Sequence, residues 1–337
     1  MSVFEGTNPA AAPPLDQEPA TLSFVETRVK GKTIRVPAVR AGAANIIVRG
    51  KFLRTAVVQD EELVEGDRIT DPDAVLRQLK QSGLKADVFT FAQPLSDPSP
   101  RHNYHFEWDN LAVAQVSSYK SWWAELSDAV QRAVKKAKKL GVVVKRAEFD
   151  DVFVQGICGI NNETPVRQGR SFWHYNKDFE TVKAENATYP DRNIFIGAYY
   201  ENELIGFVRM VRVGKVAEII NILSQMKHYD KRPANALMAK AVEVCEQEGL
   251  AQLVYCNYVY RDPNSSLTEF KRRNRFEQML VPRYYIPLTL KGRLAVALKL
   301  HHGVKALIPL GVLRMLAAVR SRFLESVMAS SKSAAQS

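Results

Sequence analysis

Two runs of mostly apolar, β-rich residues lie near the centre of the chain. One run covers residues 194–200 and the other residues 204–211, with only three polar residues between them. Two β-rich runs joined by a short polar connection are typical of an antiparallel hairpin. A third apolar run, residues 216–226, follows. The pattern therefore predicts three consecutive strands.

The spacing of apolar residues then changes to three or four positions, which predicts a helix. Pro233 suits its first position, Asp230 or Lys231 lies near its cap, and Gly249 ends it. Its apolar side consists of Leu237, Ala241, Val244 and Cys245. Residues 250–255 return as a strand. This order puts a basic loop and a helix N-terminus at the end of a strand, which is an arrangement suited to an anion.

The flanking sequence predicts further helices and strands. Residues 119–140 fit one long amphipathic helix whose second half is rich in Lys and Arg. Cations near a helix C-terminus are ordinary solvated groups, although they could also form a track for a polyanion. Residues 153–160 have helical spacing until Pro165, and residues 71–83 fit a helix followed by a strand at residues 84–91.

The densest cluster of polar side chains follows residue 161. Arg167 and Arg170 are three apart and could grip a carboxylate or phosphate with their planar guanidinium groups. His174 could serve as a base or proton donor, because the ordinary pKa of histidine lies near neutrality. Glu163 is the nearest carboxylate. A structural histidine and a helix-capping glutamate are the plainer interpretations. The cluster also holds Gln168, Tyr175, Lys177 and Asp178.

Three segments of the chain together resemble a known family. They are residues 129–144, residues 161–180 with Asn161-Asn162-Glu163-Thr164-Pro165 and Phe172-Trp173-His174-Tyr175, and residues 195–287. The order of elements resembles the core of the GNAT acyltransferases. The closer resemblance is to the branch of the Fem-type peptidoglycan-bridge transferases and their acetyltransferase-like relatives. It implies a mixed α/β fold with tandem GNAT-like units, the first of them degenerate.

The resemblance also implies where an acyl donor would bind. In the family, the loop before the central helix holds the donor's pyrophosphate, and here it contains Lys231, Arg232, Ala234, Asn235 and Ala236. The loop has no glycine, and Pro233 lacks a backbone donor. The donor could therefore be an acyl-CoA such as acetyl-CoA, or an aminoacyl-tRNA, which does not need this loop.

The residue that protonates the leaving group in the family is not found at its usual place. A tyrosine usually does so in the family, but Lys271 falls at that place and Arg275 replaces the usual glycine. We take Tyr285 as the substitute acid, with Tyr258, Tyr260 and Tyr284 as alternatives. The resemblance further implies acceptor or donor binding by Arg167 and Arg170, and we add Tyr175 and Lys177 as substrate-binding residues.

Length and patterning predict several segments. We expect a disordered tail at residues 1–20, a degenerate GNAT-like lobe at 21–117, a GNAT-like acyltransferase domain at 118–289, a basic amphipathic helical extension at 290–328, and a tail at 329–337. An unrelated α/β lobe is an alternative for residues 21–117. The extension could lie on a membrane interface or dock on a domain. None of its apolar runs reaches the ~20 residues that a spanning helix needs.

Composition adds an expected compartment and partners. The 337-residue chain carries 47 Lys and Arg against 36 Asp and Glu, a net charge of +11, which favours anionic partners. Three cysteines without metal-like spacing favour a reduced compartment and no metal site. The first residues lack the pattern of a signal peptide. We expect a cytoplasmic protein that can bind the inner face of the membrane peripherally.

The sequence thus predicts an N-acyltransferase. It would move an acyl group from acyl-CoA, a co-substrate rather than a permanently bound cofactor, to a primary amine. The acceptor would be a small molecule, a sugar nucleotide or a cell-envelope precursor. One alternative is a Fem-type transferase that uses aminoacyl-tRNA. The other is a non-catalytic module that binds a membrane surface through residues 290–328.

Overall fold

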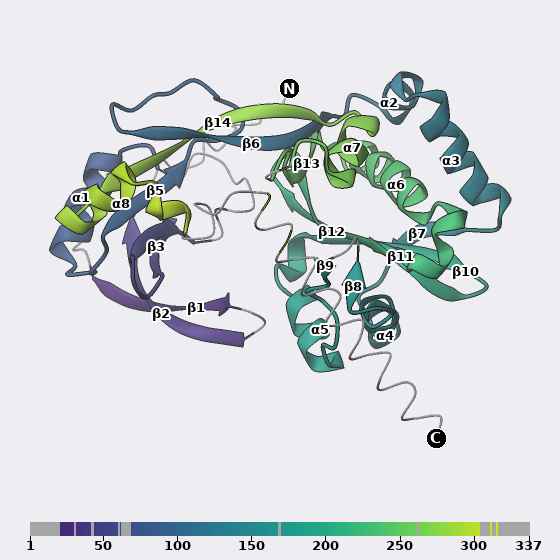
Figure 1. Cartoon of the computed structure of the whole chain (residues 1–337), viewed down its shortest axis with the longest axis horizontal. Helices are drawn as coiled ribbons and strands as arrows, with labels where there is room; N and C mark the ends of the chain where they lie inside the picture. Colours follow the sequence, from purple (N-terminus) through teal and green to yellow (C-terminus); the bar gives the residue numbers. More distant parts are fainter. Residues whose placement is uncertain are drawn as a thin grey trace, which may run out of the picture. The chain divides into compact units, whose positions relative to one another are not determined.

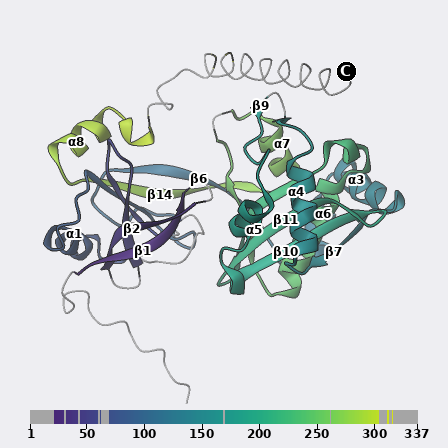
Figure 2. The same cartoon turned by 90° about the horizontal axis from the view of Figure 1, so that it is seen from below.

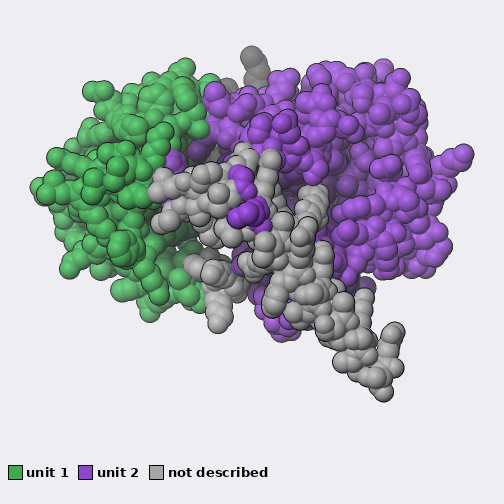
Figure 3. Space-filling view, viewed as in Figure 1, with its two compact units in different colours: residues 1–108, 281–301 green, residues 109–280, 302–337 purple. Residues whose placement is uncertain are grey.

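The computed structural model describes most of the chain between residues 21 and 303. The described residues are 21–29, 32–41, 44–59, 61, 69–167, 170–260, 262–303, 311 and 315. The expected tails and most of the extension beyond residue 303 lie outside them. The chain has a mixed α/β architecture (Figure 1). It divides into unit 1, residues 1–108 and 281–301, and unit 2, residues 109–280 and 302–337, which Figure 3 shows in two colours. The expected boundaries at 117 and 289 stay predictions.

Unit 1 is a sheet with a helix between its fourth and fifth strands and a helix after its last strand. Its elements are β1 (Leu22–Val29), β2 (Lys32–Ala41), β3 (Ala44–Arg49), β4 (Thr55–Val58), α1 (Pro72–Gln81), β5 (Val88–Ala92), β14 (Glu277–Pro287) and α8 (Leu290–Ala297). Strands β1 to β4 pair antiparallel in sequence order, and β4 pairs parallel with β5. Strand β14, although it comes late in the chain, pairs antiparallel with β5.

Unit 2 contains the predicted hairpin and central helix. Its strands are β6 (Phe106–Gln115), β7 (Val143–Ala147), β10 (Asn193–Tyr200), β11 (Glu203–Val213), β12 (Val216–Ser224) and β13 (Gln252–Asn257). Its helices are α2 (Tyr119–Glu125), α3 (Asp128–Lys139), α4 (Asp151–Asn161), α5 (Phe179–Asn186), α6 (Pro233–Gln247) and α7 (Ser266–Arg273). Strands β8 (Val166–Arg167) and β9 (Arg170–Ser171) form a separate small ribbon. The positive φ angles of Glu201 and Asn202 close the β10–β11 hairpin.

The two units repeat one order of elements. In each, three antiparallel strands lead to a helix and then to a strand parallel to the third: β2-β3-β4-α1-β5 in unit 1 and β10-β11-β12-α6-β13 in unit 2. Each sheet then gains an antiparallel strand, β14 beside β5 and β6 beside β13. Among the described residues of unit 1, no helix precedes β2 as α4 and α5 precede β10 in unit 2. The expected tandem arrangement with a reduced first copy is therefore confirmed.

Alternating side chains in unit 2 pack helices on both faces of its sheet. Ile194 and Ile196 lie in the core under α6, whereas Phe195 and Phe207 lie in the core with α4 and α5. Figures 1 and 2 show α6 on one face of β10, β11 and β12, and α4 and α5 on the other. Gly156 permits the close approach of α4, because a Cβ there would lie 2.7 Å from the Leu204 side chain.

The expected long helix at residues 119–140 is instead two helices. Leu126 has an extended backbone (ψ 144°) and ends α2, and Ser127 precedes a new start at Asp128. Ser and Asp compete for backbone hydrogen bonds and so favour helix starts over helix interiors. Trp122, Leu126 and Val130 are buried as their spacing predicts. No helix within the described residues has the length and apolar character required to cross a bilayer.

Candidate active site

The N-terminus of α6 is an open positive end. Its cap residue Arg232 adopts the left-handed conformation (φ 58°), Pro233 occupies the first position, and the first turn holds no acidic residue. Among the described residues no side chain caps this helix. Backbone N–H groups at such an end can bind an anion. The cap was expected at Asp230 or Lys231 and lies one or two residues later.

The corresponding helix of unit 1 differs in this respect. There Asp71 is the cap and accepts a hydrogen bond of 2.9 Å from the Ala74 amide. Asp73 adds a second negative charge to the first turn. One carboxylate uses a backbone N–H group that a phosphate could bind, and both carboxylates repel a phosphate. Of the two corresponding helices, therefore, only α6 has a described N-terminus with neither a capping side chain nor an acidic first turn.

Strands β12 and β13 part beside this helix end. They pair in parallel register only at Val216–Gln252, Ala217–Leu253 and Glu218–Val254. Beyond that register β12 continues to Ser224 and β13 to Asn257. Strand edges that have separated can pair with an extended ligand carrying amide groups.

A cavity of about 510 Å³ lies where the strands part and reaches the start of α6. Its walls come from the ends of β12 and β13, from the first turns of α6 and α7, and from the ribbon after α4. The lining residues are Arg167, Phe172, Ile222, Leu223, Ser224, Tyr229, Arg232, Pro233, Ala234, Asn235, Tyr255, Ser266, Leu267 and Phe270. Apolar walls with a few charged groups at one end suit a ligand with a chain and a charged head.

Arg167 and Glu163 fix this wall. The Arg167 guanidinium donates hydrogen bonds of 2.9 Å to the Ser224 carbonyl and 2.6 Å to the Ile160 carbonyl, and it stacks 4.2 Å from the centroid of Phe172. Glu163 accepts from Arg167 at 3.3 Å and from the amides of Met226 and Lys227 at 2.6 and 2.8 Å. The acidic side chain therefore holds the turn that leads into α6. Burial lowers the pKa of Arg167, but a guanidinium stays charged in proteins.

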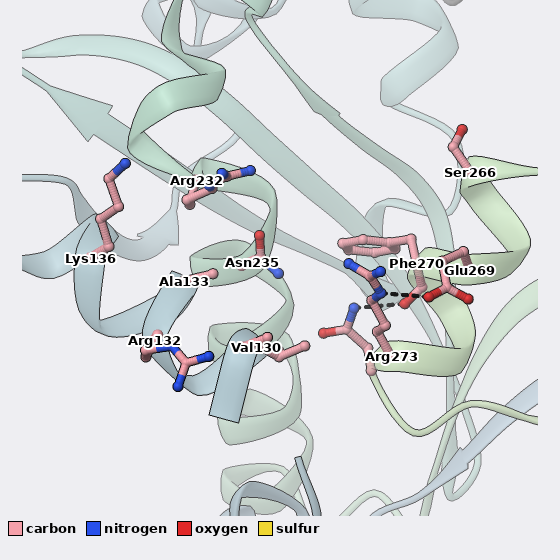
Figure 4. A pocket seen from close by; sticks show the side chains of 12 residues that line it. Val130, Arg132, Ala133, Lys136, Arg232, Asn235, Ser266, Glu269, Phe270 and Arg273 are labelled. Carbon is pink, nitrogen blue, oxygen red and sulfur yellow. Dashed lines mark hydrogen bonds and ion pairs between the residues drawn. The ribbon is translucent and has the colours of Figure 1, made fainter. Parts of the chain in front are cut away.

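A second cavity of about 560 Å³ shares Arg232, Asn235, Ser266 and Phe270 with the first. Figure 4 shows Arg132 and Lys136 of α3, Arg232 of α6 and Arg273 of α7 around it. The one acidic residue of its lining, Glu269, pairs with Arg273 at 2.6 Å and with Arg272 at 2.7 Å. These pairs hold the pKa of Glu269 near 2, so it stays negative. The remaining charges make the cavity cationic.

Lys271 lies behind the wall of the first cavity. It is 0% exposed, its Nζ donates to the Asn257 carbonyl, and the same atom lies 4.6 Å from the ring centroid of Tyr255 and 4.9 Å from that of Tyr260. Burial lowers the pKa of Lys271 to about 8. A lysine with such a pKa can exchange a proton near neutrality. Tyr255, which it touches, lines the cavity.

The structure brings together part of the predicted site. Arg167, Arg232, Ala234 and Asn235 line the first cavity. Ala236 belongs to α6 and is buried in the core of unit 2. The Lys231 ammonium lies 4.7 Å from the ring centroid of Tyr200 and 3.4 Å from Asp230, and it lines neither cavity.

The remaining predicted residues lie around or away from the cavities. His174 packs at 5.4 Å against Phe172, and burial together with the charge of Lys177 lowers its pKa to about 4, so it is neutral at pH 7. Lys177 pairs with Glu185 at 2.7 Å, and Tyr175 is exposed. Tyr285 belongs to unit 1, with its ring 4.3 Å from that of His301. The backbone of Arg170 pairs with Arg167 in the β8–β9 ribbon.

Several lining residues were not predicted. Tyr229, Tyr255, Ser266 and Phe270 come from segments that the sequence placed next to the site without marking their side chains. Arg132 and Lys136 were noticed as cations of a helix, but their position beside Arg232 depends on the packing of α3 on α6. No local pattern in the sequence signals that packing.

Residues 160–272 match the acetyltransferase (GNAT) family. The chain contains a GNAT domain. The match runs from the end of α4 into α7 and includes every lining residue of the first cavity. In the second cavity, Arg273, Asn274 and the residues of α3 lie outside it. The expected GNAT resemblance is thus confirmed. No curated protein matches the chain in sequence.

Solved structures support the same fold beyond the GNAT domain. The structure of FemX is similar with a TM-score of 0.53 and 10% identity, covering 78% of this chain and 88% of that one. L-PGS from Bacillus licheniformis has a TM-score of 0.51 and 12% identity, with 84% and 86% covered. The C-terminal domain of a putative lysylphosphatidylglycerol synthetase from Agrobacterium fabrum has a TM-score of 0.50 and 12% identity, covering 75% of this chain and 84% of that one. The chain shares their fold.

Proposed function

We propose that the chain is an N-acyltransferase that uses acyl-CoA, acetyl-CoA included, to acylate a primary amine. The single observation that carries the proposal is the cavity where β12 and β13 part, which opens at the uncapped end of α6. The first-turn backbone and Arg232 would hold the pyrophosphate. The acyl chain and its amide groups would extend between the strands. GNAT membership of residues 160–272 supports this orientation.

The reaction requires few groups from the protein. The amine nitrogen attacks the thioester carbonyl, a C–N bond forms and the C–S bond breaks. The nitrogen gives up one proton, and the sulfur leaves with its electron pair and takes up one proton. Positioning and backbone donors supply much of such catalysis. Lys271, buried behind Tyr255 with its pKa lowered to about 8, is the group that we propose to exchange a proton near neutrality. Glu163 is committed to two amides and Arg167 and therefore positions the loop.

A second candidate donor is aminoacyl-tRNA. It is favoured by the second cavity, where Arg132, Lys136, Arg232 and Arg273 surround a space large enough for a phosphorylated nucleoside. It also agrees with the fold shared with FemX and with lysylphosphatidylglycerol synthetases. From the resemblance to the Fem-type transferases, we propose a cell-envelope precursor or a sugar nucleotide as the acceptor.

Direct binding distinguishes the two donors. Isothermal titration of the full chain with acetyl-CoA and with longer acyl-CoA tests the first, and filter binding of aminoacyl-tRNA at increasing salt tests the second. We expect acyl-CoA binding that weakens at least about fivefold in Arg232→Gly. Absence of acyl-CoA binding at millimolar concentration would exclude the first donor. Binding of tRNA that does not weaken with salt would exclude the second, because phosphate contacts release counterions.

A further inference from the structure

The orientation of α8 in unit 1 is fixed by its small residues. A Cβ on Gly292 would lie 1.8 Å from the Asp87 carbonyl oxygen, so this face of the helix lies directly on the chain before β5. Ala295, three positions on, is buried on the same side. Thr289 caps the helix and donates a hydrogen bond of 3.1 Å to the Asp87 carboxylate. Rotation of α8 about its axis is therefore excluded.

The opposite face of α8 exposes large apolar side chains. Leu290, Leu294 and Leu298 are spaced four apart and are 80%, 60% and 54% exposed. Phe52, which is 87% exposed, lies near the first turn of α8, since the Lys291 ammonium is 5.0 Å from its ring centroid. These four residues form what we call the leucine surface. Single exposed apolar residues are common, but a row of this kind marks an interaction site.

Cations surround the leucine surface. Lys51 precedes Phe52, and Lys291, Arg293 and Lys299 belong to α8 or its end; all four are exposed. Arg54 is also partly exposed. The carboxylate beneath them, Asp87, is only 4% exposed and lies 3.6 Å from Lys291. Despite its burial, bonds from the Arg54 amide and Thr289 hold the pKa of Asp87 below its ordinary value.

We infer that the leucine surface and its surrounding cations bind the headgroup layer of an anionic lipid bilayer. Leucine and phenylalanine side chains would enter the boundary of the acyl chains while the cations contact lipid phosphates. A second copy of this chain is a poorer occupant. It would bring the same cations to a symmetric interface, and each copy already carries a net charge of +11. The inference does not depend on the acyl donor.

Vesicle flotation of the full chain tests the inference. We expect binding to vesicles with about 30% anionic phospholipid, little binding to neutral phosphatidylcholine vesicles, and weakening of binding with salt. In Leu290→Ser/Leu294→Ser the bound fraction should fall at least about fivefold. The matched control is Val152→Ser/Val143→Ser in unit 2, where the two side chains are 81% and 58% exposed. Equal binding by both double variants, or no binding of the unaltered chain, would overturn the inference.

A charge variant and a mass measurement complete the test. Lys51→Gln/Arg293→Gln should weaken binding to anionic vesicles, whereas Lys80→Gln/Lys85→Gln, which removes two exposed cations elsewhere in unit 1, should not. Thermal melting checks that each variant is folded. If light scattering shows a dimer that Leu290→Ser/Leu294→Ser dissociates, a second copy covers the surface and the lipid assignment is wrong. Point variants are preferable to deletion of α8, because Gly292 and Thr289 pack it into unit 1.

Discussion

The Arg167 guanidinium donates a hydrogen bond of 2.9 Å to the carbonyl oxygen of Ser224, the last residue of β12. This bond joins the segment after α4 to the strand end that lines the first cavity. Glu163 extends the connection to the turn before α6 through the amides of Met226 and Lys227. One short segment, residues 163–167, therefore positions both the end of β12 and the turn before α6. This segment lies outside both of these elements.

Glu163→Gln tests whether this carboxylate positions the donor loop. Glutamine keeps one acceptor oxygen but loses the charge that strengthens both amide bonds. We expect the KM for the donor to rise by about 3- to 10-fold with little change in kcat, as for loss of a binding contact. Steady-state kinetics with varied donor measures this. A fall in kcat of about 100-fold at unchanged donor KM would instead identify Glu163 as a catalytic base.

Arg232→Gly separates ligand binding from stability. Its left-handed backbone (φ 58°) suits glycine, so the free energy of unfolding should stay the same or rise by up to about 1 kcal/mol. The affinity for an anionic donor should nevertheless fall about 5- to 20-fold, since a guanidinium is lost.

Arg275→Gly is the matched control for Arg232→Gly. This arginine also has a left-handed backbone (φ 65°) but lines neither cavity. Its partner is Glu125, at 3.1 Å on the surface. Donor affinity should remain unchanged in this variant. Equal losses of affinity in both variants would show that the effect comes from the backbone change or the net charge.

Lys271→Met should alter the pH dependence of stability. Burial lowers the pKa of Lys271 in the folded chain to about 8, against about 10.4 for an unfolded lysine. Between these values the unfolded state binds more protons, so the free energy of unfolding rises with pH in this window. The rise should be roughly 1–3 kcal/mol. Urea unfolding from pH 7.5 to 10 should show it in the unaltered chain and not in the variant. An identical slope in both would contradict the assignment.

Two glycines of α4 should respond in opposite directions to alanine. A Cβ on Gly156 would lie 2.7 Å from the Leu204 side chain, whereas a Cβ on Gly159 would meet nothing within 4 Å. We expect Gly156→Ala to destabilise the fold by about 1–3 kcal/mol. Gly159→Ala should stabilise it by about 0.5–1 kcal/mol, because alanine favours a helix interior. Chemical denaturation gives both values. Similar effects at both sites would mean that α4 packs differently.

Local patterns were sufficient for most of unit 2. The two apolar runs between Ile194 and Val211 and the helical spacing after Pro233 predicted β10, β11 and α6 at close to their observed bounds. These signals are local, because strands buried on both faces, as β10 and β11 are, stand out as short continuous apolar runs. The break at Leu126 was missed because its apolar spacing fits one continuous helix, while the restart depends on Ser127 and Asp128.

The sequence predicted the site residues whose position follows from their order in the chain. It did not predict those whose position depends on the packing of distant helices. Arg232 and Asn235 follow from their place before and within the first turn of α6. Lys231, one residue earlier, turns toward Tyr200, and nothing in the loop sequence indicates that difference. The approach of Arg132 to Arg232 requires α3 to pack on α6, which is a contact across about a hundred residues of sequence.

The pairing of β6 with β13 and of β14 with β5 limits where the chain can be divided into fragments that fold. Strand β6 directly follows unit 1 in sequence yet completes the sheet that contains β13, while β14 follows α7 yet completes the sheet that contains β5. A fragment that stops after β5 exposes an open sheet edge, which favours aggregation. Expression of either half alone should therefore give insoluble material, and only co-expression of complementary fragments should restore a folded protein.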